Sequence, residues 1–228
     1  MSQVTQITVE TPSTTVSKPN ITPLDRRLLL IRSISLAVLI GIFIHATTNK
    51  DFIEFCITYT LWGMILSILL FIFLVIESAL SRRYLFHFNE TIFGIVWCSE
   101  FVITVFFLGG AISLLLAGQP VVKTSISRFL YNLEVHTLPI IILYLDLRRN
   151  SYSFRMKKLA YTYIPYGLYI LTAVLLSNLR DETAYSVLNW KNWVGVLLSF
   201  EIVILNLLGF LLGRKLSNEQ KIVPVSSL

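Results

Sequence analysis

Residues 128–149 place polar side chains inside a stretch that is otherwise apolar enough to lie in a bilayer. The first half of this stretch holds Asn132, Glu134 and His136, and Pro139 follows near its middle. Ionisable residues at membrane depth are rare, and they usually face protein or water at a functional site. Proline has no N–H to give the carbonyl one turn earlier, so a helix here should bend beside His136. The segment therefore predicts a polar pocket inside a helix bundle.

Three polar residues reach a similar depth if each lies on a membrane-spanning helix. Counting about 1.5 Å per residue from the luminal ends of the predicted spans, Thr58 lies roughly 9 Å deep, His136 roughly 10 Å and Glu201 roughly 12 Å. A threonine hydroxyl becomes a useful nucleophile only when a base removes its proton. We therefore predict Thr58 as nucleophile and His136 as general base.

A third group usually orients the histidine in sites of this kind, and a carboxylate can also stabilise the imidazolium. Glu201 is the depth-matched candidate for that orienting role. Asn132, one turn before His136, is a candidate donor to the oxyanion. Thr60 competes with Thr58 as nucleophile, and on a helix it would lie on a different face.

The elements that must position these residues are membrane helices. The chain of 228 residues is 55% hydrophobic and 14% charged, with a mean hydropathy of +0.72. Soluble domains carry about 25% charged residues, so the composition indicates an integral membrane protein. The net charge of +6 comes from basic residues at the ends of apolar spans, where they act as orientation signals. We therefore expect no nucleic-acid partner.

Six apolar stretches approach the roughly 20 residues that a spanning helix needs, and five spans are the main alternative. They are Leu28–Ala46, Phe52–Leu80, Ile92–Ala117, Phe129–Leu147, Tyr161–Ser177 and Trp193–Gly213. The predicted fold class is an all-α, polytopic bundle of about six transmembrane helices. Residues 1–26 are expected to form a disordered cytosolic tail, residues 27–215 the membrane domain, and residues 216–228 a cytosolic C-terminal tail.

Lysine and arginine are concentrated in the loops on one side of these spans, together with both termini. This bias predicts that both termini are cytosolic. Arg32 lies inside the first span near its cytosolic end, where we expect its side chain to extend to the headgroups. The glycosylation triplets at Asn20 and Asn89 fall on the predicted cytosolic side, so a glycan on either would reverse the predicted topology.

Other classes of site find little support in the sequence. Its three histidines lie at different predicted depths, whereas catalytic zinc needs three convergent ligands, so no metal or other cofactor is expected. Cys56 and Cys98 both lie in apolar stretches, which excludes a disulfide framework for an extracellular domain. No nucleophile-elbow, metalloprotease, Walker or dinucleotide motif is present.

The run Leu133-Glu-Val-His136-Thr-Leu-Pro139, continued by an apolar segment to Asp146-Leu-Arg148-Arg149, resembles the androgen-induced gene / androgen-dependent TFPI-regulating protein family. This resemblance implies a six-pass threonine hydrolase that cleaves the internal ester of fatty acid esters of hydroxy fatty acids. The family's histidine corresponds to His136, and its threonine corresponds to Thr58 in Phe55-Cys-Ile-Thr58-Tyr. The asparagine that often follows the family threonine is a tyrosine here, so Thr60 is the alternative match to the family threonine.

The sequence thus predicts an intramembrane, threonine-type carboxylic ester hydrolase that takes a lipid ester from the bilayer. The endoplasmic reticulum membrane is the expected location, with the cell membrane as the alternative. A non-enzymatic transport protein, with His136, Glu201 and Glu100 lining a proton path, is the second hypothesis. A membrane scaffold or regulator, in which these residues serve only packing, is the third.

Overall fold

The computed structural model describes residues 26–48, 58–80, 85–116, 126–150, 152–180 and 193–220. These residues form helices and connecting turns, with no β-strand among them. Their helices are α1 (Arg26–Thr47), α3 (Tyr59–Leu80), α4 (Phe86–Leu116), α5 (Ile126–Leu147), the 3₁₀ helix η2 (Met156–Tyr163), α6 (Ile164–Arg180) and α7 (Trp193–Gln220). The predicted all-α class is confirmed for this part of the chain. The predicted N-terminal tail up to residue 25 and residues 221–228 lie outside it.

Four of the helices are long and apolar enough to cross a membrane, by length and composition. They are Arg26–Thr47, Tyr59–Leu80, Phe86–Ile112 and Leu130–Leu147. Most of each of these segments is not buried within the protein, because its apolar side chains face outward. An outward apolar surface suits lipid and not water, so the chain is a membrane protein.

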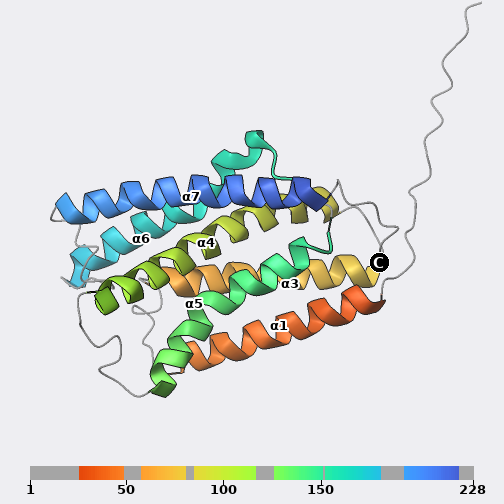
Figure 1. The fold of residues 1–228 in the computed structure, drawn as a ribbon, viewed down its shortest axis with the longest axis horizontal. Coiled ribbons are helices and arrows are strands. Elements are labelled where there is room, and N and C mark those ends of the chain that lie inside the picture. Colours follow the sequence, from red (N-terminus) through yellow and green to blue (C-terminus); the bar gives the residue numbers. More distant parts are fainter. Residues whose placement is uncertain are drawn as a thin grey trace, which may run out of the picture.

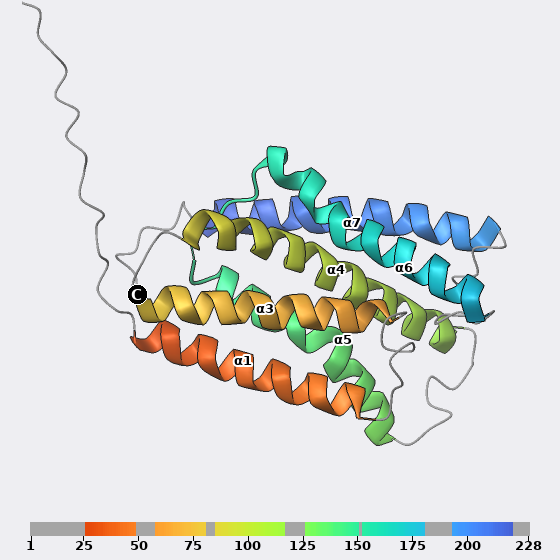
Figure 2. The same cartoon turned by 180° about the vertical axis from the view of Figure 1, so that it is seen from behind.

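The helices pack side by side with α4 at the centre of the bundle (Figure 1). α4 packs against α3, α5, α7 and η2, and α1 packs mainly against α3. The two views agree that the start of α1, the end of α3, the start of α4 and the end of α7 lie at one end of the bundle (Figures 1 and 2). Successive helices therefore run in opposite directions, as they must in a chain that crosses a membrane repeatedly.

Small residues let α7 approach α4 closely. A Cβ atom added at Gly213 would lie 2.6 Å from Phe154, and one added at Gly209 would lie 2.8 Å from Phe101. The indole N–H of Trp97 donates to the carbonyl of Gly209 at 2.9 Å. Two glycines four residues apart therefore serve packing between helices within the chain. Phe154 is buried in that contact, so the connection between α5 and η2 enters the core.

Helix α5 continues through Pro139, and it changes direction along its length (Figure 1). A proline inside a helix is the usual cause of such a bend, because it leaves the carbonyl one turn earlier without its N–H donor. Pro165 has no such effect, because it is the second residue of α6, where the first-turn N–H groups have no partner within the helix. Pro139 follows His136 by three residues on this helix.

Candidate active site

The helix bundle brings a threonine hydroxyl to His136. The Oγ1 atom of Thr60, in the first turn of α3, lies 3.4 Å from Nδ1 of His136 in α5. Thr60 is buried and His136 is partly buried. An O–H to N contact of this length is loose, but catalytic hydrogen bonds are often long before substrate binds. The contact therefore pairs His136 with Thr60, the alternative to Thr58 that the sequence left open.

Two residues of α4 hold His136 in place. The ring of Phe107 stacks on the imidazole, with 4.5 Å between ring centroids and 14° between ring planes. The hydroxyl of Thr104 donates to the backbone carbonyl of His136 at 2.7 Å. The first contact fixes the plane of the imidazole, and the second fixes the helix turn that carries it. An aromatic face also attracts a cation, so Phe107 would stabilise the His136 ring in its protonated form.

Thr58 lies directly before α3 and is partly buried. Its carbonyl accepts a hydrogen bond from the N–H of Leu61 at 3.1 Å, which forms the turn that opens the helix. Thr58 and Thr60 are therefore close in the chain but lie in different local structures. The hydroxyl found beside the His136 ring is that of Thr60.

The structure does not place Glu201 behind His136. Glu201 is exposed on α7, and α7 packs on α4 and η2. Among the described residues no hydrogen bond or ion pair joins Glu201 to His136, so the orienting role predicted from its depth finds no support. Depth along a helix axis does not fix the side of the helix on which a residue lies, and Glu201 lies on an exposed side of α7. Asn132 is also exposed, on the turn of α5 before His136.

A buried polar cluster, made of Tyr59, Ser67, Ser99 and Glu100, lies next to the Thr60–His136 pair. Glu100 is near the middle of α4, one turn before Thr104, and its side chain is fully buried. Ser67 donates to Oε1 of Glu100 at 2.8 Å. The other oxygen of Glu100, the hydroxyl of Tyr59 and the hydroxyl of Ser99 have no hydrogen-bond partner.

A second polar network lies near the opposite end of the bundle around Arg32, and here the prediction was wrong. Arg32 is only 2% exposed, so it does not extend to the headgroups. Its Nε donates to Asp146 at 3.0 Å, which forms a buried ion pair between α1 and α5. The remaining four N–H donors reach the Leu74 carbonyl, Ser78 Oγ, Asn150 Oδ1 and Tyr152 Oη. Every donor of the guanidinium therefore has an acceptor.

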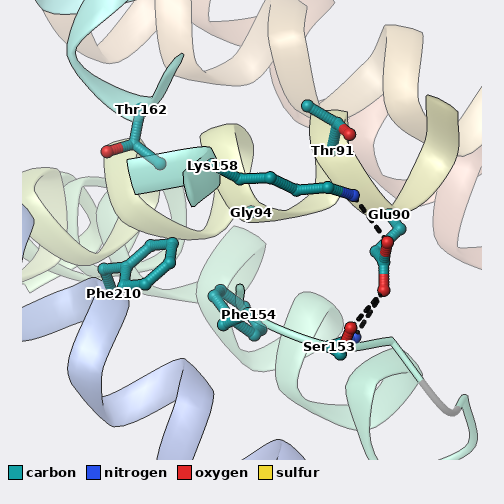
Figure 3. Close-up of a pocket in the computed structure, with 8 residues that line it drawn as sticks. All are labelled: Glu90, Thr91, Gly94, Ser153, Phe154, Lys158, Thr162 and Phe210. Carbon is teal, nitrogen blue, oxygen red and sulfur yellow. Dashed lines mark hydrogen bonds and ion pairs between the residues drawn. The ribbon is translucent and has the colours of Figure 1, made fainter. Parts of the chain in front are cut away.

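A small pocket lies beside η2, between Glu90 of α4 and Phe210 of α7 (Figure 3). The carboxylate of Glu90 points to its rim, where Lys158 donates at 2.5 Å and the Ser153 hydroxyl and N–H donate at 2.5 and 2.9 Å. Fourteen residues of α4 separate Glu90 from Thr104, which is about 21 Å along a helix. These bonds join the α5–η2 connection to α4. We therefore interpret the pocket as a feature of this structural contact.

Asn89, the acceptor of one glycosylation triplet, is fully buried. Its amide nitrogen donates to Glu77 at 2.6 Å, so a glycan on this nitrogen is incompatible with the fold. Within the described part of the chain, no three His, Cys, Asp or Glu side chains gather where they could hold a metal ion.

Comparison of the chain with models of protein families, with curated proteins and with solved structures finds no match. The assignment of a function therefore rests on the geometry of the residues.

Proposed function

We propose that the protein is an intramembrane lipid-ester hydrolase in which Thr60 is the nucleophile and His136 the base. The observation that carries this proposal is the 3.4 Å separation of Thr60 Oγ1 and His136 Nδ1, two groups 76 residues apart in sequence. A hydroxyl beside an imidazole is the minimal unit of acyl transfer through a covalent intermediate. The site lies on helices that face lipid elsewhere, so we expect the ester to enter sideways from the bilayer.

In the proposed reaction, Thr60 Oγ1 attacks the ester carbonyl carbon while Nδ1 of His136 takes the hydroxyl proton. This step needs the neutral imidazole with its own proton on Nε2. The imidazolium then gives its proton to the leaving alkoxide, and the alcohol departs. In the second half, water attacks the acyl group on Thr60 with His136 again as base, which releases the carboxylic acid and restores the hydroxyl.

The proton-path hypothesis is less favoured by the arrangement of side chains in the bundle. Between Ser67 and Glu77, about 15 Å apart along α3, the buried residues of that helix are Leu70, Phe71 and Leu74. They belong to the apolar core, together with residues of α4 and α5. A proton path needs polar steps or water through such a layer. The polar cluster and the Arg32 network are thus separated by apolar side chains along α3.

As part of this proposal we include α6 and α7 as the fifth and sixth spans, with both termini cytosolic. The basic residues near the ends of α1, α5 and α7 support this orientation. An ester of a hydroxy fatty acid, suggested by the family resemblance, is the first substrate to test.

The test is labelling of the purified protein with a lipid-like fluorophosphonate, followed by mass spectrometry of the modified peptide. We expect an adduct on Thr60 that disappears in His136→Ala and Thr60→Ala. Thr137→Ala is the matched control, since Thr137 neighbours His136 but donates to the Leu133 carbonyl at 2.5 Å. An adduct on Thr58 would move the nucleophile by two residues. No adduct in folded protein, together with no ester cleavage, would overturn the proposal.

A further inference from the structure

Most buried polar groups of the described chain have partners, and three of the four exceptions belong to one cluster. Four buried side-chain atoms lack a hydrogen bond: the hydroxyls of Tyr59 and Ser99, Oε2 of Glu100 and Oδ1 of Asn89. The first three belong to the buried polar cluster. A buried polar atom without a partner costs about 1–3 kcal/mol. Three such atoms together indicate that the cluster binds something.

Helix packing brings the residues of this cluster together between α3 and α4. Tyr59, Gly63 and Ser67 occupy successive turns of α3, and a Cβ atom at Gly63 would lie 3.0 Å from Oε1 of Glu100. The lack of a side chain at Gly63 therefore lets the Glu100 carboxyl lie against α3. The Tyr59 hydroxyl lies close to both Ser99 and Glu100, but its geometry toward the Ser99 hydroxyl falls short of a regular hydrogen bond.

The cluster is closed from the lipid side. The ring of Tyr59 packs against Tyr169 of α6, with 4.8 Å between ring centroids, and against Tyr166 at 6.2 Å. Tyr59 is 7% exposed, and Ser99 and Glu100 are 0% exposed. A lipid headgroup cannot enter so enclosed a place, which leaves a small polar molecule as the ligand.

The chemistry of the three groups suits water. Two hydroxyls that can donate or accept and one carboxyl oxygen that accepts provide three partners, which is the usual number for a buried water. The cluster is also adjacent to the reaction centre. Thr60 directly follows Tyr59, and Thr104, one turn after Glu100, bonds the backbone of His136.

We propose that Tyr59, Ser99 and Glu100 hold a bound water, and that this water is the one that hydrolyses the acyl group on Thr60. The second part rests on the proposed function. The water oxygen bonds to the acyl carbon, and the bond from that carbon to Thr60 Oγ1 breaks. His136 takes one proton from the water and returns it to Oγ1, so the product is the free acid. The three residues that hold the water are positioning residues in this step.

The first experiment detects the water without reference to activity. Brief X-ray radiolysis makes hydroxyl radicals from bound water, and mass spectrometry finds the modified side chains. Tyr59 should be modified several-fold faster than Tyr152, the matched control, which is 1% exposed and whose hydroxyl contacts Arg32 and Glu77. Ser99→Ala and Glu100→Leu should reduce modification of Tyr59 to the level of Tyr152. The water site would be overturned if Tyr59 and Tyr152 were modified at equal rates in the wild type. It would also be overturned if neither Ser99→Ala nor Glu100→Leu slowed the modification of Tyr59.

The second experiment tests what the water does. In Glu100→Leu the acyl group should accumulate on Thr60 when ester is added, because formation of the acyl-enzyme needs no water and its hydrolysis does. Glu100→Gln retains polar atoms that can hold the water, so this variant should hydrolyse the ester faster than Glu100→Leu. If Glu100→Leu fails to fold, Glu100→Gln takes its place in the experiment. Normal turnover in both variants, with Tyr59 still modified in the wild type, would overturn the hydrolytic role alone. An absence of acyl-Thr60 in every variant and in the wild type would overturn the proposed function but leave the water site standing.

Discussion

The Arg32 network and the buried polar cluster around Glu100 both place ionisable groups inside a membrane bundle, but they differ in how completely these groups are paired. Arg32 has an acceptor for each of its donors, and Asp146 also accepts from Asn150 at 2.7 Å. Glu100 has one hydrogen bond, from Ser67, and three atoms of its cluster have none. Full pairing offsets the cost of burial and joins helices, whereas incomplete pairing leaves capacity for a ligand.

Position along the bundle follows the same division. The Arg32 network lies near one end and joins α1, α3 and α5 with the connection that follows α5. The Glu100 cluster lies near the middle of α4, next to the Thr60–His136 pair. We therefore interpret the first network as structural and the second as part of the functional site. Four predictions test this division, in order of expected effect.

The largest effect is expected at the reaction centre. His136→Ala should lower the rate of ester cleavage by about 10²–10⁴-fold, because a positioned general base contributes a factor of that size. The rate is measured with a chromogenic lipid ester in detergent, and unfolding in the same detergent reports whether the fold is retained. Thr60→Ala should have a comparable effect and Thr58→Ala a small one. The reverse order for the two threonines would make Thr58 the nucleophile.

Asp146→Ala should destabilise the protein by about 3–5 kcal/mol, because it leaves the buried charge of Arg32 without its partner. Glu100→Gln, by contrast, should cost about 1 kcal/mol or less, because the amide oxygen can still accept the bond from Ser67. Unfolding in mixed detergent measures both. The double variant Arg32→Met/Asp146→Leu should recover most of the loss, since it removes both charges. Equal costs for Asp146→Ala and Glu100→Gln would contradict the division.

Gly63→Ala should strain the Glu100 cluster from the α3 side. The added Cβ would lie 2.4 Å from Ile103 Cδ1, and a clash of this kind costs about 1–3 kcal/mol where the neighbours are tightly packed. The control is Gly41→Ala in α1, where no atom lies within 4 Å and no loss is expected. Thermal unfolding of Gly63→Ala and Gly41→Ala measures the difference in stability between the two variants. A tolerated Gly63→Ala would show that the end of the Ile103 side chain and the Glu100 carboxyl can both move away from α3.

The smallest effect is expected for two tyrosine hydroxyls. Tyr152→Phe removes weak contacts to Arg32 at 3.4 Å and to Glu77 at 3.5 Å, so it should cost at most about 0.5–1.5 kcal/mol. The pKa of the Tyr152 hydroxyl is raised by burial, so the group is neutral and this cost should not vary across physiological pH. If only protein atoms contact the Tyr59 hydroxyl, Tyr59→Phe should leave the free energy of unfolding unchanged. A measurable cost there would instead agree with a bound water.

Much of the fold follows from the order of residues alone. Apolar stretches of spanning length predicted the helices, because a backbone in lipid must satisfy its own hydrogen bonds. Helix ends shifted by several residues in places: α4 begins at Phe86 instead of Ile92, and α7 continues to Gln220, into the predicted tail. Polar residues at these ends lower the local hydropathy, so hydropathy could not locate the ends.

His136 could be identified from the sequence because a histidine within an apolar helix is costly and needs a reason. Its partners could not be identified. Counting residues gives depth at about 1.5 Å per residue, but it does not give the direction in which a side chain points from its helix. Thr58, Thr60 and Glu201 all had suitable depths, and only the packing of α3, α5 and α7 showed that Thr60 faces the histidine and that Glu201 faces outward.

The pairing of Arg32 with Asp146 shows the same limit. By itself the sequence determined that the chain is an apolar, all-helical membrane protein with one unusual polar stretch around His136, because composition and spacing act locally. The tertiary structure alone decided which polar groups meet, since Arg32 and Asp146 are 114 residues apart and each would be costly without the other. It also decided which buried groups stay unpaired, because that depends on how helices rotate and pack against one another.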